Sequence, residues 1–315
     1  MSTLPARRAA VPTALAVLFA SVLAGCSLDG AAGHGPAASE PDVRPLSGAA
    51  SFSHAQAVRL HDLEEQAIAP CMAARGQRYT PQPRVASARS EETNPYGLLG
   101  PRKAAADGYG IVGEYLYLRS SPPPSGDESR APAWRRALTG TAKHQVSVRL
   151  PDGSRVEYFA DGCVARARAE VYGADWDRTE PVVAALSTRV LAAVEKDPDY
   201  RAAIRRWSAC MAETGHPADD PQASRARLNG RLAKAAADPT SLRALGREEI
   251  RTATADARCQ AQAELAKTIG RVQRSVEKRV LSAAERRVVA RHVAAKRDVL
   301  KASVTSGASR SPGAA

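Results

Sequence analysis

Cysteine is the residue type in this chain whose number and spacing most directly predict chemistry. The 315-residue sequence contains five cysteines: Cys26, Cys71, Cys163, Cys210 and Cys259. Cysteines outside the reducing cytosol form disulfides, clustered thiolates bind zinc, and single thiols carry acyl groups. No Cys-x-x-Cys pair occurs in the chain, and this disfavours a zinc site. The surroundings of each cysteine therefore decide among these chemistries.

Cys26 ends the run Leu23-Ala24-Gly25-Cys26. A basic start at Arg7-Arg8 and an apolar stretch over 11–22 precede it, and that stretch is shorter than the about 20 residues that span a bilayer. This order of segments is typical of a removable export signal. It resembles the lipobox of bacterial lipoproteins, in which the cysteine is diacylated and the precursor is cleaved just before it. The resemblance implies a signal peptide over residues 1–25 and a palmitate-type lipid anchor on Cys26. An ordinary secretory signal followed by an unrelated cysteine is the alternative.

The other four cysteines fall into two similar pairs. Cys71 and Cys210 each begin a Cys-Met-Ala-x-x-Gly motif, and an aspartate stands just ahead of Cys163 and of Cys259. An even number of cysteines in an exported chain predicts two disulfides. The repeated motif favours the pairing Cys71–Cys163 and Cys210–Cys259 over the two other connectivities.

Composition divides the chain into segments. Residues 26–52 are rich in Gly, Ala, Ser and Pro, and this composition predicts a flexible tether. Residues 53–175 mix helical and strand patterns around Cys71 and Cys163, and residues 176–302 are helical throughout. Residues 303–315 are small and polar, and we expect a disordered tail. The fold class predicted is mainly α with one small β-hairpin, with an α+β N-terminal part and a helical C-terminal part.

Several local patterns predict the elements of the first part. Ser53 and Gln56 have capping-box spacing and should begin a helix with a proline-induced kink at Pro70. The predicted buried face of that helix is Leu60, Leu63, Ala67 and Cys71. The stretches 101–107, 134–138 and 163–172 are expected to be helical. Alternating apolar residues around a Pro-Asp-Gly-Ser turn at 151–154 predict the hairpin.

Acid–proline pairs predict where the helices of the second part begin. An acidic N-cap followed by proline at the first helical position is a helix-start signal. The pairs are Glu180-Pro181, Asp197-Pro198, Asp220-Pro221 and Asp238-Pro239. They predict helices near 181–195, 198–214 and 221–236, and one long element from 239 towards 302.

Positive charge is concentrated in the second part. The formal net charge is +12, and residues 267–301 alone hold 11 basic and 3 acidic side chains. Export argues against a nucleic-acid partner, so the candidate polyanions are anionic lipid head groups or wall polymer. The candidate contact residues are Arg271, Arg274, Lys278 and Arg279. The alternative is a solvated basic face on a helix that packs on its own domain through the apolar positions Ile269, Val272, Val276, Val280, Ala284 and Val288.

No motif in the chain predicts catalysis or a cofactor. Nucleophile-elbow, zinc-protease, phosphate-loop and dinucleotide fingerprints are all missing from the sequence. His54, His61 and Glu65 share one helix face, but their spacing is too generic to predict a metal site. We therefore expect a protein that is not an enzyme and that has neither a metal nor a cofactor.

From Asn94 to Gly173 the chain resembles uncharacterised secreted proteins and lipoproteins of actinomycetes. The matching elements are Tyr96-Gly97, Tyr109-Gly110, Trp134-x-x-Ala137-Leu138-x-Gly140 and Asp161-Gly162-Cys163. The resemblance implies an accessory role beside envelope transport proteins and no defined activity. The expected function is that of a non-enzymatic binding or accessory lipoprotein of the cell envelope. A ligand-binding lipoprotein of a transporter and a cell-wall enzyme are the alternatives, in that order.

Overall fold

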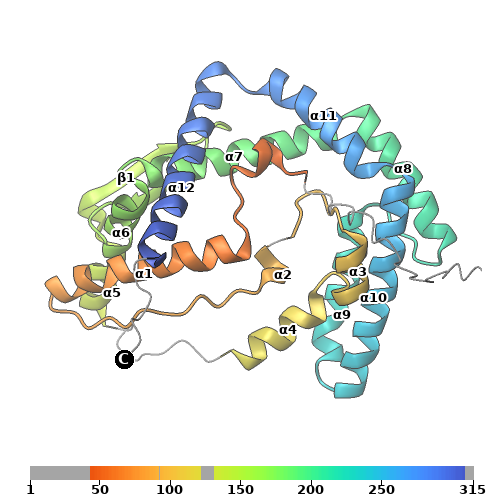
Figure 1. Cartoon of the computed structure of the whole chain (residues 1–315), viewed down its shortest axis with the longest axis horizontal. Helices are drawn as coiled ribbons and strands as arrows, with labels where there is room; N and C mark the ends of the chain where they lie inside the picture. Colours follow the sequence, from red (N-terminus) through yellow and green to blue (C-terminus); the bar gives the residue numbers. More distant parts are fainter. Residues whose placement is uncertain (1–42, 92, 122–130, 309–315) are drawn as a thin grey trace, which may run out of the picture. The chain divides into compact units, whose positions relative to one another are not determined.

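Helices predominate in the computed structural model, which describes residues 43–91, 93–121 and 131–308 (Figure 1). Two antiparallel strands form one hairpin, so the predicted fold class, mainly α with one small β-hairpin, is confirmed. The predicted signal peptide, Cys26 and the tether up to residue 42 lie outside the described residues, as do residues 309–315.

The first part of the chain folds around α1 (His54–Ala74), which begins with the predicted capping box. α1 buries Ala57, Leu60, Ile68 and Met72. Leu63, Ala67 and Cys71, which we predicted on this face, are only half-buried. The buried face is turned because Ile68 and Met72 pack on the two helices that flank the hairpin in sequence.

The hairpin and the elements on either side of it are, in chain order, α5 (Pro132–Thr139), η3 (Ala142–His144), β1 (Gln145–Arg149), β2 (Arg155–Phe159) and α6 (Cys163–Tyr172). The strands pair in register from Gln145 opposite Phe159 to Arg149 opposite Arg155. A disulfide between Cys71 and Cys163 joins α1 to α6 across 92 residues of sequence. It confirms the first predicted pairing.

The described residues between α1 and α5 contain three short helices: α2 (Ala88–Glu91), α3 (Pro101–Asp107) and α4 (Ile111–Ser120). α3 was predicted with these bounds, but α4 has no capping side chain of its own and was missed. Glu249 from a distant helix accepts hydrogen bonds from the backbone N–H groups of Ile111 and Val112. A tertiary contact therefore starts α4, and no local pattern marks it.

The second part begins with α7 (Trp176–Glu195), α8 (Pro198–Glu213) and α9 (Pro221–Ala235). Asp197 and Asp220 cap α8 and α9 as predicted. Glu180-Pro181 starts no helix, because α7 begins at Trp176 and includes Pro181. The indole of Trp176 stacks on Tyr172 with ring centroids 4.1 Å apart, and this buried contact places the start of α7 upstream of the proline.

The long element predicted from 239 towards 302 is wrong. Three helices occupy the region: α10 (Pro239–Gln262), α11 (Leu265–Val280) and α12 (Ala283–Ala308). Between α10 and α11 the helix is interrupted at Glu264, whose backbone is left-handed with φ 51°. Ser282 and Glu285 form a reciprocal capping box at the second junction, a sequence signal that we overlooked. α12 also continues to Ala308, beyond the helix end predicted near residue 302.

The largest core lies between α7, α8, α10 and α11. The disulfide Cys210–Cys259 joins α8 to α10 inside it and confirms the second predicted pairing. η1 (Pro45–Gly48) also packs there, with Leu46 and Ala49 buried. Residues 43–52 are therefore not part of a flexible tether, because their apolar side chains have a place in the core.

α10 also contacts α3, α4 and α9, so packing crosses the predicted boundary at residue 175 (Figure 1). Among the described residues, no helix has the length and apolar character needed to cross a bilayer.

Candidate functional site

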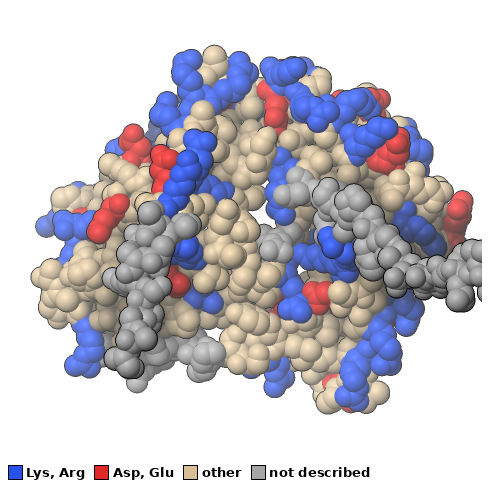
Figure 2. All heavy atoms as spheres, in the orientation of Figure 1, with Lys and Arg blue, Asp and Glu red and all other residues tan. Residues whose placement is uncertain are grey.

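The predicted polyanion-contact residues lie on the outer face of α11. Arg271, Arg274, Lys278 and Arg279 are exposed, and Arg271 forms an ion pair of 2.7 Å with Asp199. Figure 2 shows basic side chains gathered along the upper edge of the view, over α11 and the start of α12.

The apolar positions beneath this face are largely used by the protein's own core. Ile269, Val272 and Val276 are buried against α7 and α8, whereas Ala284 is exposed beyond the break in the helix. A helix with its apolar side so occupied presents only charge to a partner.

The histidine cluster considered in the sequence forms no metal site. His61 Nε2 lies 2.8 Å from the carbonyl oxygen of Gln82. The Glu65 carboxylate accepts hydrogen bonds from the Tyr79 hydroxyl and the Gln82 backbone N–H. No group of three or more potential metal ligands occurs in the described ranges.

The structure contains a cavity of about 780 Å³ that the sequence did not predict. Its volume lies within the roughly 300–1,000 Å³ of small-molecule sites in proteins. None of the described residues that line it is acidic. Six cationic side chains line it: Arg44, Lys103, Arg225, Lys296, Arg297 and Lys301. In Figure 2, basic side chains border the hollow near the middle of the view.

Segments far apart in sequence build the walls of this cavity. The segment 44–53 and the start of α1 form one wall, and the loop 93–100 with α3 forms another. Arg225 comes from α9. The α12 face adds Val293, Lys296, Arg297, Leu300 and Lys301.

Packing fixes the segment 44–53 in place. Asn94 donates a side-chain hydrogen bond of 2.9 Å to the carbonyl oxygen of Val43. Gln273 Nε2 donates to the carbonyl oxygen of Arg44, and the Leu46 N–H donates to Glu277. This wall of the cavity is therefore held by α11.

Lys296 lies over the aromatic ring of Phe52, with Nζ 3.6 Å from the ring centroid. Burial lowers the pKa of Lys296 to about 8. Phe52 in turn packs with Leu300 against the small core formed by Leu60, Tyr172 and Trp176. One end of the cavity thus combines apolar surface with a cation whose charge is only partly solvated.

Arg225 lines the cavity on the side of α9. Its guanidinium lies 5.1 Å from the centroid of the Tyr109 ring, and Nη2 donates a long hydrogen bond of 3.4 Å to the Gly97 carbonyl oxygen. Its buried Nε–H has no hydrogen-bond acceptor among the described residues. Burial also lowers the pKa of Arg225, although the nearby Asp256 carboxylate opposes this effect. A buried donor without an acceptor is costly to the fold.

The backbone at Gly97 requires glycine. Its φ is +74°, and a Cβ atom there would lie 2.7 Å from Cβ of Pro221 at the start of α9. The Tyr96-Gly97 pair noted in the sequence therefore brings the loop 93–100 against α9, beside Arg225.

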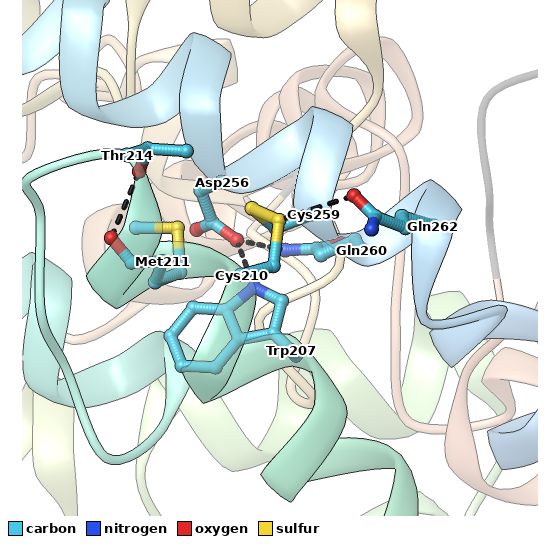
Figure 3. The surroundings of a disulfide bond; sticks show 8 residues. All are labelled: Trp207, Cys210, Met211, Thr214, Asp256, Cys259, Gln260 and Gln262. Atoms are coloured by element: carbon cyan, nitrogen blue, oxygen red, sulfur yellow. Dashed lines mark hydrogen bonds between the residues drawn. A yellow bond between two sulfur atoms is a disulfide. The ribbon is translucent and has the colours of Figure 1, made fainter.

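A buried carboxylate network supports this wall (Figure 3). Asp256 is fully buried and accepts hydrogen bonds from Trp207 Nε1 at 2.7 Å and Gln260 Nε2 at 2.8 Å. The Tyr109 hydroxyl donates to the same carboxylate at 2.9 Å. Burial raises the pKa of Asp256, and these hydrogen bonds oppose the rise. Because Trp207, Gln260 and Tyr109 all donate to Asp256, the network fixes α8, α10 and the segment at Tyr109 relative to one another.

No family model, curated protein or solved structure matches this chain. The chemistry of the cavity must therefore be argued from its own residues. Cationic side chains at several places on a concave wall attract anions electrostatically, and the described residues that line this wall include no acid. Lysine and arginine also donate charge-assisted hydrogen bonds to phosphate and carboxylate oxygens. The cavity can therefore hold an anion.

A sequence signal for this site was present on α12. Val293, Lys296, Arg297, Leu300 and Lys301 follow the spacing of a single helix face. A face that mixes apolar residues with three cations is unusual for a helix packed on a core, where charged side chains normally lie opposite. The contributions of Arg44, Lys103 and Arg225 depend on tertiary packing and carry no comparable signal.

Proposed function

We propose that this protein is a non-enzymatic lipoprotein, anchored through Cys26 on the extracytoplasmic face of the cell membrane, that binds an anionic ligand in the basic cavity. The observation that carries the binding role is the set of six cationic side chains around one cavity of about 780 Å³. The Leu23-Ala24-Gly25-Cys26 run supports the address.

A calorimetric titration with pyrophosphate tests the binding role. The protein is the mature chain with Cys26 replaced by Ser, so that it stays in solution. Lys296→Gln with Arg297→Gln removes two charges from the cavity wall. Arg274→Gln with Lys278→Gln removes the same charge from the outer face of α11 and is the matched control.

Each charge-assisted hydrogen bond lost is worth roughly 1.5–3 kcal/mol. The cavity variant should therefore bind pyrophosphate at least about tenfold more weakly than the parent, whereas the control should bind it almost as tightly. No binding by the parent, or equal losses in the two variants, would contradict a specific site in the cavity.

This ligand-binding role also fits a lipoprotein that passes its ligand to an envelope transport protein. The cationic lining of a cavity of small-molecule size favours ligand binding over a purely structural accessory role. A cell-wall enzyme is the weaker alternative, because the described residues that line the cavity include no carboxylate, histidine or cysteine.

The outer face of α11 supports a second role, contact with anionic lipid or wall polymer through Arg271, Arg274, Lys278 and Arg279. Each basic residue near an anionic surface adds about 1 kcal/mol, and salt screens the attraction. Binding of the same soluble chain to anionic vesicles should fall steeply with salt and weaken when these four residues become Gln. If vesicle binding changed neither with salt nor with the four substitutions, the basic face of α11 would be a solvated surface without an anionic partner.

A further inference from the structure

The cavity is larger and more apolar than a site for a small inorganic anion requires. Phe52, Val293 and Leu300 line it together with the cations, and Val293 remains 37 % exposed. Apolar surface left in contact with water is unfavourable, and a ligand with an apolar part would cover it. The walls therefore fit a ligand that is both anionic and apolar.

On α12, apolar and cationic side chains of the cavity wall lie side by side. Val293 and Leu300 are seven positions apart and lie on one face, with Lys296 and Arg297 between them. The Lys296 ammonium is already in contact with the Phe52 ring. A ligand that reached these residues would meet hydrocarbon and positive charge at the same end of the cavity.

The number and type of cations favour phosphate as the anionic group. A phosphate monoester carries about −1.5 to −2 charges at neutral pH and has three strong acceptor oxygens. Three of the six lining cations are arginines, whose planar guanidinium matches phosphate oxygens.

The position of the cavity in the sequence points to the source of such a ligand. Its first wall, residues 44–53, follows directly on the segment that would lead to the lipid anchor. Val43 stands 17 positions after Cys26. Even fully extended, that length of chain reaches only about 60 Å. A cavity so tethered stays within reach of the membrane surface, where amphiphiles are concentrated.

From these observations we infer that the ligand is a phosphate-bearing amphiphile, with its phosphate on the cations of the cavity and its hydrocarbon chain against Phe52, Val293 and Leu300. The inference rests on the proposed anion-binding function and specifies its ligand class.

Three matched probes test it by calorimetry on the soluble mature chain. Lauroyl lysophosphatidic acid, below its micelle concentration, carries both the phosphate and the chain. Glycerol 3-phosphate lacks the chain, and monolaurin lacks the phosphate. Because each buried methylene contributes a roughly fourfold factor in affinity, the complete amphiphile should bind at least about tenfold more tightly than glycerol 3-phosphate. Monolaurin should bind more weakly than the complete amphiphile by a similar factor.

Two variants assign the contacts. Arg225→Gln should weaken both phosphate probes. Val293→Asn should weaken only the amphiphile, because it alters the apolar wall without removing charge. Leu116→Asn on α4, whose side chain is 51 % exposed and lies outside the cavity, is the matched control and should change neither affinity. Circular dichroism of each variant checks that the helices are intact.

The outcomes separate this inference from the function on which it rests. Equal affinity for the amphiphile and glycerol 3-phosphate would overturn the inference and leave anion binding in place. Monolaurin binding as tightly as the amphiphile, or no binding of any probe, would overturn both. Val293→Asn behaving like Leu116→Asn would also overturn the placement of the hydrocarbon chain.

Discussion

At the scale of single residues, burial decides which charges this protein can carry. His292 is 3 % exposed and stacks on Trp176 with ring centroids 4.3 Å apart. Its Nδ1 has no hydrogen-bond partner in the described part of the chain. Burial, together with the nearby Lys296 charge, lowers the pKa of His292 to about 4. The imidazole is therefore neutral in the folded protein at every pH at which the cavity is expected to work.

This shift predicts a loss of stability in mild acid. Between about pH 6.5 and 4 the histidine of the unfolded chain takes up a proton that the folded chain does not bind, so the free energy of unfolding falls as pH falls. The melting temperature should drop by a few degrees more in the parent than in His292→Phe, which keeps a stacked ring but cannot titrate.

Comparing the two proteins isolates His292 from the buried carboxyls, whose raised pKa values act in the opposite direction. His144→Gln, at an exposed position, is the control and should behave like the parent. Identical pH profiles for the parent and His292→Phe would show that the stack does not depress this pKa.

At the scale of elements, local chemistry predicted most helix starts and failed where tertiary contacts override it. Ser53, Asp197 and Asp220 all cap helices as their sequence contexts indicate. Glu180 does not, because Trp176, four residues earlier, stacks on the buried Tyr172 and starts the helix there. The start of α4 depends on Glu249, 138 positions away from Ile111, and no local pattern encodes that contact.

The two kinds of acid–proline pair predict different costs on mutation. The Asp220 carboxylate accepts a hydrogen bond of 2.8 Å from the Ala223 N–H at the start of α9. Asp220→Ala should lower the free energy of unfolding by about 1 kcal/mol, measured by urea denaturation. Glu180→Ala, in the pair that caps nothing, is the control and should have little effect. Equal losses would mean that the cap bond of Asp220 contributes nothing specific.

At the scale of the whole molecule, the sequence was sufficient for the fold class and both disulfides but not for the cavity. The repeated Cys-Met-Ala-x-x-Gly motif identified Cys71–Cys163 and Cys210–Cys259. The cavity could not be read in the same way, because Arg44, Lys103 and Arg225 are brought together only by tertiary packing. Loop-closure entropy makes each bridge worth roughly 4 kcal/mol, for loops of 92 and 49 residues.

The proposed lipid anchor on Cys26 leads to a prediction that does not depend on the cavity. In cells fed labelled palmitate, the parent should incorporate label and sediment with membranes, because two acyl chains give stable attachment. Cys26→Ala should incorporate none and should lose its membrane attachment through lipid. Equal labelling of the two proteins would contradict the lipid anchor.

Chemical labelling of lysines tests the central claim, that the cavity binds an anion, most directly. The pKa of about 8 leaves much of Lys296 uncharged and nucleophilic near that pH, whereas an ordinary lysine titrates near 10.4. Acetic anhydride followed by peptide mapping compares Lys296 with Lys278, an exposed lysine of α11. Saturating pyrophosphate should suppress acetylation of Lys296 several-fold and leave Lys278 unchanged. Unchanged acetylation of Lys296, or equal protection of both lysines, would contradict an anion bound in the cavity.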